Sequence, residues 1–128
     1  MVEENLTVLV VEPGKKPYIR SIPSGLASLQ NEVGGYIQAV YPWDEPCAII
    51  CDEEGKLKNK PFNRALRDES GDIYDIITGT FLVVGLGEDN FKSLESKHLQ
   101  QFATLFERPE LFFRADGKIA VVPVQENE

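Results

Sequence analysis

The chain has 128 residues, of which 42% are hydrophobic and 27% charged, and it carries a formal net charge of −8. These values are typical of one folded domain and exclude an intrinsically disordered chain, because enough apolar side chains are present to form a core. Acidic residues outnumber basic ones by 21 to 13, which argues against a general nucleic-acid binder, since such proteins use Lys and Arg to neutralise phosphates.

The first two predicted elements form a hairpin. Residues 6–11 (LTVLVV) are a continuous apolar run, which is typical of a central strand, and the turn residues Pro13 and Gly14 follow it. Residues 17–22 predict an edge strand, since Pro17 stands at its start, where a missing backbone N–H is tolerated.

A helix that turns directly into a strand is predicted next. Ser24 is the expected N-cap, and Leu26, Leu29 and Val33 recur at the spacing of one helix face. Gly34 supplies the left-handed residue that commonly ends a helix. Residues 36–41 then predict a strand.

The two cysteines lie in the next predicted strand, residues 47–52. Cys47 and Cys51 would point to the same face about 13 Å apart, whereas a disulfide needs Cα atoms within about 7 Å. We therefore expect two buried thiols. Residues 58–67 (KNKPFNRALR) favour a short helical turn, with Pro61 near its start.

The last third of the chain predicts a strand, a helix and a hairpin. The strand spans residues 76–84 and is interrupted by Gly79, the helix runs from a cap at Ser93 to about Phe106, and the hairpin spans residues 112–124. Together the elements predict one α+β domain over residues 1–128. We expect a mostly antiparallel sheet of about five to seven strands with two helices packed on one side.

Three blocks of the chain, residues 6–22, 29–41 and 63–91, together resemble a family of small uncharacterised proteins of bacteria, phages and conjugative elements, which is catalogued only as a domain of unknown function. The resemblance covers about residues 5–106 and leaves 107–128 as a C-terminal hairpin extension. It implies a role in a mobile genetic element, often near antirestriction or plasmid-maintenance genes, and implies no catalytic residue.

A basic segment is the strongest candidate for a ligand site. Five of the thirteen basic residues lie within residues 56–67, between two acidic stretches. Arg64 beside Asn63 has the donors to hold a phosphate or carboxylate, and Gly79 with Thr80 would let a ligand approach the backbone. The alternative is a charged loop that pairs with its own acidic neighbours.

Other patterns lack the residues that their chemistry needs. Residues 85–89 (GLGED) have neither the third glycine of a dinucleotide-binding loop nor the GK[ST] of a P-loop, and predict a turn. Asp68, Asp72 and Asp75 do not follow EF-hand spacing. The single histidine, His98, is expected at the surface or at the boundary of a helix's apolar face, without a nucleophile beside it. The sequence therefore assigns no catalytic residue, no metal ligand and no cofactor.

An aromatic tip is a candidate interface. Tyr41 and Trp43 flank Pro42 and precede an acid, and aromatic side chains are favoured at protein interfaces. Packing over the end of the sheet is the alternative.

Three functions stay open. The first is a non-enzymatic interaction protein of a mobile genetic element that binds a host or element-encoded protein, such as a defence or regulatory component. The resemblance, the acidic balance and the lack of a catalytic set favour it. The alternatives are a domain that binds a small, nucleotide-like anion and an unrecognised enzyme. The acidic N-terminal residues and the strand-sized apolar runs predict a cytoplasmic location, with no membrane association and no direct nucleic-acid binding.

Overall fold

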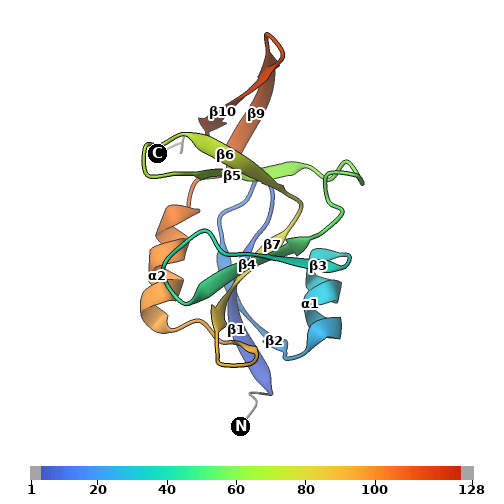
Figure 1. Cartoon of the computed structure of the whole chain (residues 1–128), viewed down its shortest axis with the longest axis vertical. Coiled ribbons are helices and arrows are strands. Elements are labelled where there is room, and N and C mark those ends of the chain that lie inside the picture. Colours follow the sequence, from blue (N-terminus) through green and yellow to red (C-terminus); the bar gives the residue numbers. More distant parts are fainter. Residues whose placement is uncertain (1–3, 125–128) are drawn as a thin grey trace.

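The computed structural model describes residues 4–124, so residues 1–3 and 125–128, at the ends of the predicted domain, lie outside the described part. Two helices, α1 (Leu26–Val33) and α2 (Ser96–Leu105), accompany the strands of this part (Figure 1). The strands are β1 (Asn5–Val11), β2 (Tyr18–Pro23), β3 (Ile37–Val40), β4 (Cys47–Asp52), β5 (Phe62–Arg67), β6 (Ile73–Thr78), β7 (Phe81–Leu86), β8 (Phe91–Lys92), β9 (Glu110–Ala115) and β10 (Lys118–Pro123).

The strands form one main sheet and two small ones. The main sheet has six strands in the order β2-β1-β7-β4-β3, with β8 paired to β7, and the small sheets are β5–β6 and β9–β10. All of these pairings are antiparallel. The predicted α+β class with a mostly antiparallel sheet of five to seven strands is therefore confirmed.

The two helices lie on opposite faces of the main sheet, not on one side as expected (Figure 1). Leu9 and Val83 pack in one core with Phe102 of α2, whereas Val8 packs in the other with Leu29 of α1. The central strands are apolar on both of their faces, and each face needs its own cover. The continuous apolar runs of β1, β4 and β7 are the sequence feature that makes both faces of these strands apolar.

The segment before β7 differs most from the predictions. Residues 62–67 form β5 and not a helical turn, because pairing with β6, in which Ala65 opposes Ile76, overrides the local helix preference. Gly79 does not interrupt one strand: its φ of 71° turns the chain from β6 in a small sheet into β7 in the main sheet.

The N-cap residues of both helices differ from the predicted ones. Gly25 is the N-cap of α1 and no side chain caps it, so the cap is not Ser24. Ser93 accepts a hydrogen bond from the backbone N–H of Thr7 at 2.8 Å, while Glu95 is the N-cap of α2. At the other end of α1, Gly34 has the expected left-handed conformation, with φ 77°.

The C-terminal hairpin is confirmed and projects from the body of the molecule (Figure 1). Asp116 and Gly117 both have positive φ, at 52° and 76°, as a tight two-residue hairpin turn requires. Within residues 4–124, neither helix is long and apolar enough to cross a membrane.

Candidate functional site

The residues predicted to bind an anion form a buried junction between the main sheet and the β5–β6 sheet. The Asn63 amide donates to the carbonyl of Val11 and to that of Gly79, each at 2.8 Å. Both bonds are buried, and they tie the end of β1 to the turn between β6 and β7.

The Arg64 guanidinium is buried, and all of its donors form hydrogen bonds within the protein. Its five N–H groups bond to the carbonyl oxygens of Phe106, Lys15 and Asn63 and to the Asn63 side-chain oxygen, over 2.7–3.3 Å. Burial lowers the pKa of Arg64, and the charge of Glu110 opposes that shift. Arg64 thus joins the end of α2 to the turn between β1 and β2.

Gly79 belongs to the same junction, and Thr80 follows it, half-buried. A Cβ on Gly79 would lie 2.8 Å from Cδ of Lys60, so the glycine lets the lysine side chain pass over the turn. The structure therefore brings Asn63, Arg64 and Gly79 together, but around protein groups. The anion-binding prediction for these residues stays a prediction, and we place the candidate site elsewhere.

The basic segment pairs with acids of this chain, which is the alternative that the sequence left open. Lys58 and Lys60 reach the Asp52 carboxylate at 2.8 and 2.6 Å, and Lys60 also donates to the Val33 carbonyl at the end of α1 at 2.8 Å. A Cβ on Gly35 would lie 2.6 Å from Asp52 Oδ1, so this glycine makes room for the cluster.

Both cysteines are buried free thiols, as expected. Burial raises the pKa of Cys51 to about 11 and also raises that of Cys47. Because the thiolate is the reactive form, we expect neither thiol of the folded protein to react with DTNB at about pH 8, and both to react in urea. Titration of released chromophore measures this, and a thiol that reacts under native conditions would contradict the burial.

His98 is buried, in contrast to its predicted surface or boundary position. Its ring lies on that of Phe102 with centroids 6.1 Å apart. The periodicity of the helix placed it near the apolar face but did not indicate that its side chain is buried.

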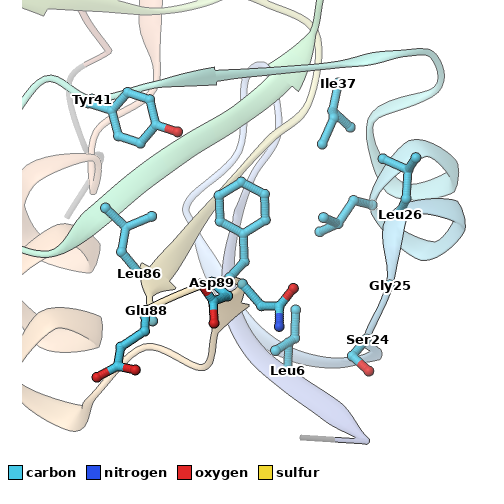
Figure 2. Close-up of a pocket in the computed structure, with 13 residues that line it drawn as sticks. Leu6, Ser24, Gly25, Leu26, Ile37, Tyr41, Leu86, Glu88 and Asp89 are labelled. Atoms are coloured by element: carbon cyan, nitrogen blue, oxygen red, sulfur yellow. The ribbon is translucent and has the colours of Figure 1, made fainter. Parts of the chain in front are cut away.

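An exposed hollow of ≈ 480 Å³ lies beside α1, at the edge of the core that α1 covers (Figure 2). Tyr41 and Leu86 stand on one side of it and Leu26 on the other, with Asp89 near its lower edge and Glu88 directed outward. We call it the α1 hollow. Its lining residues are Leu6, Ser24, Gly25, Leu26, Leu29, Ile37, Tyr41, Leu86, Gly87, Glu88, Asp89, Asn90 and Phe91.

The short helix explains why this hollow exists. α1 has only eight residues, which gives a length of about 12 Å. The helix therefore covers only part of its sheet face. Leu26 is 57% and Tyr41 61% exposed at the uncovered part, which leaves apolar and aromatic surface in contact with solvent.

The two aromatic residues of the predicted interface are separated. Tyr41 lines the α1 hollow, while Trp43 packs in the core on the α2 side, with its ring centroid 4.1 Å from that of Phe102. The sequence did not indicate that Glu88 and Asp89 would line the same hollow as Tyr41, because residues 85–89 predict only a turn. That turn is present, with the Gly87 N–H bonded to the Asn90 carbonyl at 2.8 Å.

The comparisons identify a family but no characterised relative. A family described as "Domain of unknown function (DUF3846)" matches residues 6–107. No curated protein and no solved structure matches the chain. The matched range ends just before the β9–β10 hairpin and includes every residue of the α1 hollow.

Proposed function

The chain belongs to the family of domains of unknown function DUF3846, and for this member we propose a non-enzymatic protein-binding role. The α1 hollow receives a segment of a partner protein. The observation that carries the proposal is an exposed apolar hollow with two acidic residues in its lining, Glu88 and Asp89.

The chemistry of the hollow selects one kind of occupant. Leu26, Leu86 and Tyr41 suit an apolar side chain, because burying them removes exposed apolar area from water. The carboxylates of Glu88 and Asp89 suit a neighbouring Lys or Arg. The proposed ligand is therefore a peptide segment that combines a large apolar residue with a basic one.

The setting of the proposal comes from the family resemblance. The resemblance implies a role in a mobile element, so we propose that the partner is a host or element-encoded protein, such as a component of defence or regulation. An acidic chain of net charge −8 favours association with a basic partner surface at low ionic strength.

Selection from a displayed random-peptide library tests the role. We expect the immobilised protein to enrich peptides in which an apolar residue stands near Lys or Arg. The Glu88→Lys/Asp89→Lys double variant should bind the enriched peptides about tenfold more weakly, because attraction becomes repulsion, and Leu26→Ser should also weaken binding. Fluorescence anisotropy of a labelled selected peptide gives the affinities.

A matched charge change provides the control. Glu53 and Glu54 are also adjacent, exposed acids, but they lie outside the α1 hollow. Glu53→Lys/Glu54→Lys should leave peptide affinity unchanged within about twofold. The proposal fails if no peptide is enriched, or if both double variants weaken binding equally.

A further inference from the structure

A second hollow, of ≈ 330 Å³, lies on the α2 side of the molecule. It is bounded by β5, β6, the end of α2 and the base of the β9–β10 hairpin, which meet in one region of the fold (Figure 1). We call it the arginine hollow. Its lining includes Trp43, Arg64, Arg67, Tyr74, Arg108 and Glu110.

Positive charge gathers around this hollow although the chain as a whole is acidic. Arg64, Arg67 and Arg108 all line it, against one acid, Glu110. Glu110 is already engaged, because it accepts the Arg67 guanidinium at 2.9 Å and the Ala65 N–H at 2.8 Å.

Arg108 supplies the free donors. It is exposed and makes no ion pair or hydrogen bond through its side chain within residues 4–124. Two further acids, Asp68 and Glu69, line an adjoining hollow, and Asp68 accepts the backbone N–H groups of Ser70 and Asp72. A guanidinium without a carboxylate partner is suited to bind an anionic oxygen with two parallel hydrogen bonds.

Two aromatic rings line the same hollow. Trp43 is fixed by Phe102 and Phe106, with ring centroids 4.1 and 6.2 Å away, and Tyr74 on β6 is 54% exposed. A fixed indole and an exposed phenol offer stacking surfaces to a planar ring, and a purine or pyrimidine base presents such a ring.

We propose that the arginine hollow binds a nucleotide, with its base against Trp43 and Tyr74 and its phosphate at Arg108. The volume falls in the range of small-molecule sites, about 300–1,000 Å³. This site lies apart from the α1 hollow, with which it shares no lining residue. Arg64 lines this hollow too, but the proposed phosphate contact is Arg108, because the donors of Asn63 and Arg64 are used within the protein.

Calorimetric titration of the full chain with AMP, GMP, CMP, UMP and a cyclic dinucleotide tests the proposal. We expect saturable binding of at least one nucleotide. Adenosine and inorganic phosphate, which each lack half of the ligand, should bind at least about tenfold more weakly than the matching nucleotide. Affinity should fall as salt is raised, because the phosphate contact is electrostatic.

Two variants at exposed positions locate the site without disturbing the core. Arg108→Gln and Tyr74→Ala should each weaken nucleotide binding about tenfold. Arg114→Gln removes the same charge from an exposed position outside the hollow and should leave binding unchanged. The proposal is overturned if no nucleotide of the panel binds at millimolar concentration, or if Arg108→Gln and Arg114→Gln weaken binding equally.

Discussion

Replacing Arg64 by Met is expected to lower the free energy of unfolding by about 4 kcal/mol, the largest effect of any substitution considered for this protein. Met retains much of the length of the side chain but removes all five donors. The carbonyl oxygens of Phe106, Lys15 and Asn63 would lose their partner in the interior. Release of a desolvated charge offsets part of this loss, and for this reason we expect about 4 kcal/mol and not more.

Urea denaturation followed through the fluorescence of the single tryptophan, Trp43, measures this change. Arg67→Met is the matched control: the residue lies on the same strand, β5, but its side chain is 39% exposed and forms an ion pair with Glu110. The Arg67→Met substitution should lower the free energy of unfolding by about 1 kcal/mol or less. If Arg64→Met lowers the free energy of unfolding no more than Arg67→Met does, the five bonds of Arg64 do not hold the junction.

The sequence predicted the elements whose signal is local. The apolar runs of β1, β4 and β7, the glycine stop at Gly34 and the Asp116-Gly117 turn each determine structure through residues that are close in the chain. The sequence did not predict which face each helix covers. The two helices lie on opposite faces because the central strands are apolar on both faces, and each face must be covered.

The candidate sites were harder to predict because their partners are distant in the chain. Arg64 stands 42 residues from Phe106 and 49 from Lys15, so no local pattern indicates that its donors are used. The strand β5 was missed for the same reason, since β6 supplies its hydrogen bonds. Likewise, Glu88 and Asp89 come to line the same hollow as Tyr41 only through the antiparallel pairing of β7 with β4 and of β4 with β3.

The two hollows lie beside different helices and have opposite charge. The α1 hollow contains Glu88 and Asp89 among apolar residues, while the arginine hollow contains three arginines and one glutamate. A protein partner at the first and a nucleotide at the second would therefore bind without competing for residues.

Replacing Asp52 by Asn is expected to lower the free energy of unfolding by about 1.5 kcal/mol at neutral pH. The Asp52 side chain is 1% exposed. Its burial favours a higher pKa, but hydrogen bonds from Lys58, Lys60 and the Glu54 N–H outweigh burial and lower the pKa from 3.8 to about 2. That difference corresponds to about 2.5 kcal/mol, and screening around Lys58, whose side chain is 41% exposed, reduces the expected loss.

The pH dependence identifies the charge as the cause. Because the pKa of Asp52 is lower in the folded state, its contribution is complete above the unfolded pKa of 3.8 and is lost as the pH falls from there through about 2. Wild type and Asp52→Asn should therefore differ in urea midpoint at pH 7 and converge near pH 2. Asp75→Asn removes an ion pair with Lys56 that is more exposed than the pairs of Asp52. It should lower the free energy of unfolding by about 0.5 kcal/mol or less. If the difference in urea midpoint between wild type and Asp52→Asn stays constant with pH, Asp52 stabilises the fold through packing. Lys58 and Lys60 would then bind the carbonyl oxygens at the end of α1 without help from the Asp52 charge.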